Sequence, residues 1–177
     1  MTVRWSGFWP WLGLAAGLSA AQIPPPQVPE SLRAPASQTV LLKATGRGKQ
    51  IYGCQAGSGG PAKFEWVLKR PQADLFDAQG RKIGRHFEGP TWEATDGSKV
   101  VGEVLQRAAA PRPGAVPWLL LKAKTTQGTG LFGQVTYVQR VATVGGAAPA
   151  SGCNQAHAGK EIAIDYHADY YFYAARR

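Results

Sequence analysis

The sequence predicts an all-β fold, a single-domain antiparallel β-sandwich or barrel with little helix. From residue 39 onward, short runs rich in β-branched and aromatic residues are separated by Gly, Pro and Asp, which is the pattern of strands joined by turns. These runs recur about every ten residues, a spacing typical of sandwiches and barrels. The best helix candidate is one short turn within residues 151–161, which Ser151 could cap.

The run "KFEWVLK" shows the strand pattern most clearly. Phe64, Trp66 and Leu68 alternate with charged residues, so the apolar side chains share one face of a half-buried strand. Further strands are expected at residues 39–45, 49–55, 98–107, 117–125, 133–144 and 161–173.

Two short segments carry turn signals. The stretch "FDAQGRK" at residues 76–82 predicts a tight reversal, with Gly80 at the position that needs a positive φ. The stretch "TDGS" at residues 95–98 contains Asp-Gly, which predicts a hairpin with a two-residue loop. In that register Glu93 lies opposite Val100 on the return strand.

The first 21 residues are expected to be a secretory signal peptide. Arg4 precedes the apolar run "WSGFWPWLGLAA", and small residues follow up to Ala21, where cleavage is expected. The run contains Pro10 and is shorter than the roughly 20 residues of a membrane span. The protein is therefore expected to be secreted or periplasmic, with no transmembrane anchor after cleavage.

The rest of the chain divides into an arm and a domain. Residues 22–36 are proline-rich and are expected to form an extended N-terminal arm. Residues 37–177 are expected to form a single β-rich domain, since their number suits one core.

The charge of the chain narrows the choice of partner. The formal net charge is +9, and the cations are scattered in ones and twos among acidic residues. A nucleic-acid reader would need a basic stripe and a matching motif, and the sequence has neither. An anionic or carbohydrate component of the cell envelope is the partner that the positive charge and the aromatic residues favour.

The chain has two cysteines, Cys54 and Cys153. In an exported protein such a pair indicates a disulfide, and the spacing of a redox CxxC motif is absent. The alternative is two free thiols, one of them catalytic.

The stretch "HFEGPTWEATDGS" concentrates reactive side chains. A serine triad is not expected there, because His86 would need an acid on one side and a nucleophile on the other. Asp96 is assigned to its turn. Glu93 is expected to be half-buried, with either a raised pKa or an arginine partner. Structural pairing is the favoured role for Glu93, and a binding or acid–base role stays open.

Other chemistries find little support. The three histidines lack zinc-like spacing, and "VGGAAPASG" lacks the order of a dinucleotide-binding loop. We therefore predict no metal, no cofactor and no catalytic residue. The tail "DYHADYYFY" places Tyr170 and Tyr171 on the last strand, where aromatic rings could fill the core or form a platform for a flat ligand.

Residues 28–173 resemble the domain-of-unknown-function family 3455, which groups exported proteins of bacteria and fungi. The matching stretches are "QIYGC", "FEWVLKRPQADLFDAQGRKIGRHFEGPTWEATDGSKVVG", "PWLLLKA", "VQRVATVGGAAPASGC" and "ADYYFY". The resemblance implies a secreted β-rich domain with no established activity. It draws attention to His86, Trp92, Glu93, Asp96 and Arg140, which lie in the matching motifs, and gives none of them a role.

Two functional hypotheses follow. The first is a non-enzymatic binding or structural domain of the cell envelope or extracellular space. The alternative is a carboxylate-based hydrolase acting on envelope polymers, with Glu93 as general acid or base and a second acid within about 5–10 Å. The candidate ligand-binding residues are His86, Trp92, Glu93, Asp96, Arg140, Tyr170 and Tyr171.

Overall fold

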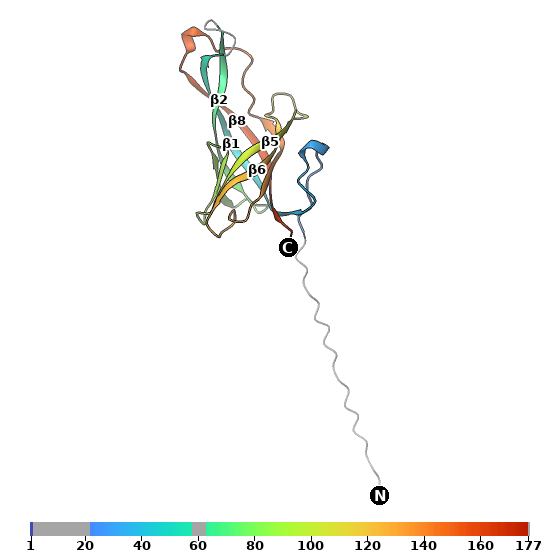
Figure 1. Cartoon of the computed structure of the whole chain (residues 1–177). Helices are drawn as coiled ribbons and strands as arrows, with labels where there is room; N and C mark the ends of the chain where they lie inside the picture. Colours follow the sequence, from blue (N-terminus) through green and yellow to red (C-terminus); the bar gives the residue numbers. More distant parts are fainter. Residues whose placement is uncertain (2–21, 58–62, 177) are drawn as a thin grey trace.

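The computed structural model of the chain describes residue 1, residues 22–57 and residues 63–176. The expected signal peptide, apart from its first residue, lies outside the described residues. Eight antiparallel strands form one sheet that closes into a barrel, with each strand paired to the next and β8 paired to β1 (Figure 1). The strands are β1 (Gln38–Ala56), β2 (Phe64–Phe76), β3 (Lys82–Phe87), β4 (Thr91–Ala94), β5 (Lys99–Ala108), β6 (Trp118–Gln127), β7 (Tyr137–Gly145) and β8 (Glu161–Ala175). The all-β prediction is confirmed, in its barrel form.

The two strands expected at residues 39–45 and 49–55 are one continuous strand, β1. Gly46 and Gly48 lie between the two predicted runs, and they continue the strand instead of turning it. Because both residues lack a side chain, neighbouring groups pack directly against their backbone inside the barrel. A Cβ on Gly46 would lie 2.6 Å from the Tyr170 ring, and one on Gly48 would lie 2.1 Å from the Gln72 carbonyl oxygen. These glycines therefore serve close packing rather than a turn.

Aromatic rings fill the interior that the small residues leave open. Tyr170 and Phe172 of β8 and Trp92 of β4 are fully buried, and their rings meet edge-on or tilted. Phe132, from the loop between β6 and β7, packs on Phe172 with ring centroids 4.6 Å apart. Pairing small residues on one strand with large ones on its neighbour is how a narrow barrel reaches a packed core.

The β4–β5 hairpin has a different register from the predicted one. Glu93 pairs with Lys99 instead of Val100, because the loop has three residues, Thr95 to Gly97. Gly97 has a φ of +83°, which is the left-handed position that closes a three-residue loop. The one-residue shift turns Val100 inward, where it is fully buried.

The sequence prediction was wrong on two further points. It omitted β3, whose sequence "KIGRHF" is short and mixes polar with apolar residues. The short helical turn expected within residues 151–161 is present as a 3-10 segment, η2 (Gln155–His157), but its N-cap is Asn154 and not Ser151. The carbonyl of Ser151 instead accepts a hydrogen bond from Trp66 Nε1 at 3.0 Å. The reversal at residues 77–81, with Gly80 at a φ of +76°, is confirmed.

The proline-rich segment before β1 lies on the outside of the barrel. It contains another 3-10 segment, η1 (Glu30–Leu32), which lies beside β5 and β6 (Figure 1). Leu32 is fully buried there, and its carbonyl accepts a hydrogen bond from the Gln139 side chain. No helix in the described part of the chain is long and apolar enough to span a membrane.

The predicted disulfide between Cys54 and Cys153 is present. Cys54 lies near the end of β1, and Cys153 lies in the segment of residues 146–160 that leads into β8. β1 and β2 extend past the other strands towards this segment, which is orange at the top of Figure 1. The disulfide therefore ties the segment of residues 146–160 to the end of β1.

Candidate ligand-binding site

One end of the barrel opens into a pocket of about 330 Å³, which we call the mouth pocket. Strand directions bring the turn at residues 88–90 and the loop at residues 109–117 to this end, together with residues 146–160. Barrel mouths are common places for small-molecule sites. The apolar part of the lining consists of Leu68, Pro71, Pro90, Val104, Val116, Pro117 and Leu119. The polar part consists of Gln50, Tyr52, Lys69, Arg70, His86, Arg107 and Arg140.

Arg140 brings a positive charge into the mouth pocket. It lies on β7 directly opposite Tyr170 of β8, so its side chain is on the same side of the sheet as that buried ring. Its Nε and Nη2 atoms donate to the carbonyl oxygen of Pro117, at 3.2 and 2.8 Å. Among the described residues no carboxylate forms an ion pair with Arg140. The guanidinium is therefore a cation without a counter-charge from the chain.

Gln50 places a buried amide at the same pocket. Its side chain is 1% exposed, and neither its oxygen nor its nitrogen has a hydrogen-bond partner in the described part of the protein. The Gln50 amide lies near the Tyr166 hydroxyl and, against the raising effect of burial, lowers the pKa of that phenol slightly. The two groups are not oriented for a hydrogen bond. A buried amide without a protein partner takes its hydrogen bonds from a bound ligand or an ordered water.

Tyrosine hydroxyls surround these two side chains. The hydroxyls of Tyr166 and Tyr170 are 3.1 Å apart, and the Tyr52 hydroxyl donates to the Gly146 carbonyl. Burial raises the pKa of all three phenols, against an opposing effect of the Arg140 charge. The phenols are therefore neutral, and they supply polarity to the interior without negative charge.

His86 lies at the boundary between the mouth pocket and the core. It is 3% exposed, and its Nδ1 is 2.8 Å from the carbonyl oxygen of Thr91. Burial lowers the pKa of His86 to about 3, against the effect of the Thr91 carbonyl, and the Arg140 charge adds to the lowering. The ring is therefore neutral at ordinary pH. Because a carbonyl only accepts, Nδ1 carries the proton and Nε2 is left as an acceptor.

Three further cations lie at the rim of the mouth pocket. Arg70 forms a two-pronged hydrogen-bonded pair with Glu161, and Lys69 donates to the Gln55 side chain. Arg107 forms no ion pair with any described residue. No aspartate or glutamate lines the pocket within the described residues. The mouth pocket therefore has an uncompensated positive charge.

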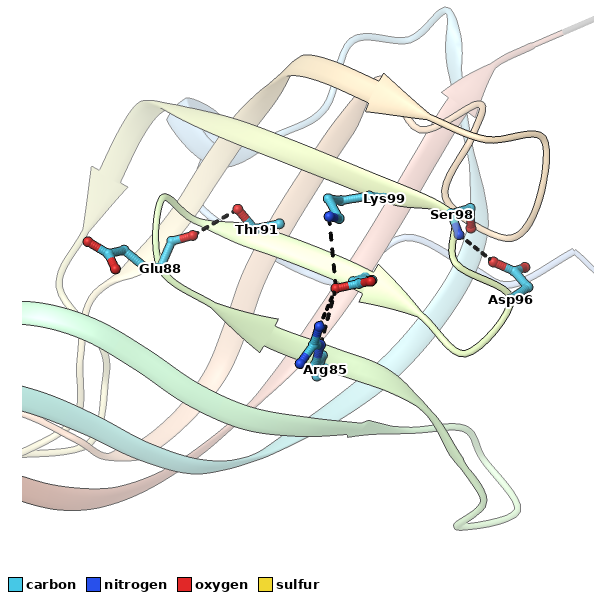
Figure 2. A network of polar contacts seen from close by, with 7 residues as sticks. Arg85, Glu88, Thr91, Asp96, Ser98 and Lys99 are labelled. Carbon is cyan, nitrogen blue, oxygen red and sulfur yellow. Dashed lines mark hydrogen bonds and ion pairs between the residues drawn. The ribbon is translucent and has the colours of Figure 1, made fainter.

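Glu93 lies outside the barrel, away from the mouth pocket. Its carboxylate accepts hydrogen bonds from Arg85 and lies 4.0 Å from Lys99. Figure 2 shows these two cations on the strands on either side of β4. Of the two alternatives predicted for Glu93, a raised pKa or an arginine partner, the structure has the arginine partner. The bond from Arg85 lowers the pKa of Glu93, against an opposing effect of burial, and the charges of Arg85 and Lys99 add to the lowering.

Asp96 and Tyr171 also lie away from the mouth pocket. Asp96 accepts a hydrogen bond from the backbone amide of Ser98 at 2.8 Å (Figure 2). It also accepts one from the backbone amide of Leu131 at 2.7 Å. It therefore joins the β4–β5 loop to the β6–β7 loop at the other end of the barrel. Tyr171 faces outward beside Lys43, whose ammonium group lies 5.4 Å from the centre of the ring.

The structure thus brings together only part of the predicted site. His86 and Arg140 line the mouth pocket, while Trp92 and Tyr170 lie behind them in the core. Sequence analysis missed Gln50. A signal was present, because Gln50 follows Gly46 and Gly48 at a spacing of two residues and is the polar member of that inward-facing row.

The described residues offer no set of metal ligands. No group of three or more His, Cys, Asp or Glu side chains in residues 22–57 and 63–176 could hold a metal ion. The polar groups of the mouth pocket are donors, cations and neutral rings, which are suited to holding a ligand and not a cation.

The fold and the pocket define a class: a closed antiparallel β-barrel, bound by one disulfide, with a cationic pocket at one mouth. The chain belongs to the family described as "Protein of unknown function (DUF3455)", whose profile matches residues 35–174. No curated protein and no solved structure matches the chain.

Proposed function

We propose that the protein is an exported, non-enzymatic binding domain of the cell envelope or extracellular space, and that its ligand occupies the mouth pocket. The ligand would come from the anionic or carbohydrate components of the envelope. The observation that carries this proposal is the Gln50 amide, which is buried at the pocket with both polar atoms unpaired. Such a group is costly to retain unless something binds to it.

Further observations support binding without catalysis. The described lining of the mouth pocket contains no carboxylate, cysteine or serine that could act as a nucleophile or a carboxylate pair. Glu93, the suspected acid of the hydrolase hypothesis, is held in an ion pair on the outer face. The hydrolase hypothesis thus loses the residue on which it depended. Export is supported by the N-terminal sequence and by the disulfide.

Native mass spectrometry of the protein from the exported fraction of its own host tests this proposal. We expect a chain that begins at Gln22, with both cysteines oxidised and with an added mass that is lost on denaturation. Val104→Trp places an indole in the mouth pocket and should remove the added mass.

Leu105→Trp is the matched control, because Leu105 is the next residue on β5 and is 45% exposed. It should keep the added mass. An added mass that survives Val104→Trp would place the ligand elsewhere and contradict the proposal, as would a wild-type protein without any retained mass.

A further inference from the structure

The charges around the mouth pocket are unbalanced. Four cations line it, and only Arg70 is paired with a carboxylate, that of Glu161, with Glu88 exerting a weaker attraction. Arg140, the innermost of the four, has no acidic partner among the described residues, and its neighbours there are neutral: it donates to the Pro117 carbonyl and lies within hydrogen-bonding reach of the Tyr170 hydroxyl. A half-buried cation in this situation favours an anion as its partner.

The guanidinium of Arg140 has free donors in a useful position. Pro117 takes Nε and one N–H of Nη2, so the Nη1 group and the second N–H of Nη2 are left for the Tyr170 hydroxyl and for a ligand. These two groups form the end-on edge of the guanidinium, which matches the two oxygens of a carboxylate. The nearby Tyr170 hydroxyl is neutral and offers no competing negative charge.

Gln50 supplies a second donor at the same pocket. Its buried NH₂ group has no hydrogen-bond partner in the described protein, and it lies on β1, across the closing strand β8 from Arg140 on β7. Two donors from different strands can hold one oxyanion from two sides. An oxyanion would satisfy the charge of Arg140 and the unpaired NH₂ of Gln50 together.

Apolar side chains line the mouth pocket beside Arg140, and Leu119 is its direct cross-strand neighbour. Val104, Val116 and Leu119 contribute aliphatic side chains, and Pro90 lies beside them. A volume of about 330 Å³ exceeds what a bare inorganic anion would fill. The pocket therefore offers cations for a charged head group and aliphatic surface for a carbon skeleton.

We propose that the mouth pocket binds a small organic acid, with its oxyanion on Arg140 and the Gln50 amide and its apolar body against Val104 and Leu119. This inference rests on the proposed function and specifies the ligand. Carboxylates and phosphate esters share the required oxyanion chemistry, and the choice of probes separates them.

Isothermal titration calorimetry with the oxidised protein tests the inference. The probes are benzoate and hexanoate, their neutral amides benzamide and hexanamide, and phenyl phosphate and inorganic phosphate. We expect saturable binding of the carboxylates, and amides at least about tenfold weaker, because a charge-assisted hydrogen bond is lost. Inorganic phosphate should bind more weakly than benzoate because it leaves the aliphatic surface uncovered. Phenyl phosphate shows whether the head group can be a phosphate ester.

Arg140→Gln should weaken benzoate binding about tenfold to a hundredfold. Arg112→Gln is the matched control: Arg112 is exposed, lies in the loop at the same end of the barrel and does not line the pocket. It removes the same charge and should change the affinity less than about twofold. Gln50→Met keeps the shape and should weaken binding several-fold with no loss of thermal stability, so the test does not depend on how well Arg140→Gln folds.

Three results would overturn the inference. Equal affinity for benzoate and benzamide, abolished by Val104→Trp, would mean a ligand-binding pocket without anion selectivity, and the proposed function would survive. If inorganic phosphate bound as tightly as benzoate, the apolar part of the ligand would contribute nothing to the affinity. Binding of none of the acids would also contradict the inference, and the retained mass of the host-exported protein would then decide the proposed function separately.

Discussion

The imidazole of His86 is stacked on the indole of Trp92, with ring centroids 4.5 Å apart and planes inclined by 7°. The stack joins the mouth pocket to the core, since the Tyr170 ring meets both partners edge-on. The stacked position has no room for hydration of an imidazolium, and for this reason burial holds His86 neutral. The aromatic core and the mouth pocket are therefore one packed unit.

Acid should destabilise the protein through His86. The folded pKa is about 3 and the unfolded value is about 6.5, so the unfolded chain binds the extra proton between these pH values. Stability from this residue is complete above pH 6.5 and is lost as the pH falls towards 3. The free energy of unfolding should fall by about 3 kcal/mol between pH 7 and pH 4. Urea unfolding at a series of pH values measures this slope.

His86→Phe keeps an aromatic ring against Trp92 and removes the titrating group. The free energy of unfolding of this variant should therefore lose most of the pH dependence between pH 7 and pH 4. His167→Gln changes an exposed histidine and should keep the wild-type slope. A His86→Phe slope equal to that of the wild type would show that His86 is not buried as a neutral ring.

Three glycines of β1 should tolerate alanine to different degrees. A Cβ on Gly48 would meet the backbone carbonyl of Gln72 at 2.1 Å, and one on Gly46 would meet the Tyr170 ring at 2.6 Å. A Cβ on Gly53 would meet only the flexible end of Lys69. We expect Gly48→Ala to be the most destabilising and Gly46→Ala to cost about 1–3 kcal/mol. Gly53→Ala should be close to neutral, and chemical denaturation of the three variants that gives another order would contradict the packing described.

The end of the barrel opposite the mouth should loosen when Ser98 is changed. The Ser98 hydroxyl accepts a hydrogen bond from the buried backbone amide of Phe132 at 2.9 Å. Ser98→Ala leaves that amide without an acceptor and should cost about 1–3 kcal/mol. Hydrogen exchange should speed up at Phe132, while the amide of Leu131, held by Asp96, should change less.

Asp96→Asn is the complementary change, because the amide group that replaces the carboxylate keeps one oxygen for two backbone donors. Its main effect should be on the exchange of Leu131. If both variants altered both amides equally, the two contacts would not be separate.

Reduction of the disulfide should lower stability. Cys54 and Cys153 are 99 residues apart in the sequence, and closing a loop of that length stabilises a fold by up to about 4.7 kcal/mol on the chain-entropy model. A strong reductant should lower the melting temperature of the wild type. A variant with both cysteines changed to serine should start lower and show no response to reductant, and a response there would point to a different cause.

Local chemistry explains which features were predictable. The Gly80 reversal, the all-β class and the cysteine pair each depend on neighbouring residues or on composition, and all three are confirmed. The alternation predicted for the run at residues 63–69 is wrong at Leu68, which is 47% exposed. The hairpin register failed by one residue, because the same Asp-Gly pair fits a two-residue or a three-residue loop and only packing of Val100 selects between them.

The mouth pocket depends on contacts far apart in the sequence. Arg140 meets the pocket only because β7 pairs with both β6 and β8 in one register, and Gln50 faces it only because β1 runs unbroken through two glycines. Periodicity could place both residues on inward faces. It could not show that these faces meet around one pocket, or that the charge of Arg140 has no ion-pair partner there.

Titration of ¹⁵N-labelled protein with benzoate, followed by nuclear magnetic resonance, tests whether Arg140 and Gln50 bind an anion together. The account predicts saturable shifts of the Gln50 side-chain amide and of the Arg140 Nε–H, with the same dissociation constant for both. Shifts confined to exposed lysine and arginine groups outside the mouth pocket, with the Gln50 signal unmoved, would contradict it.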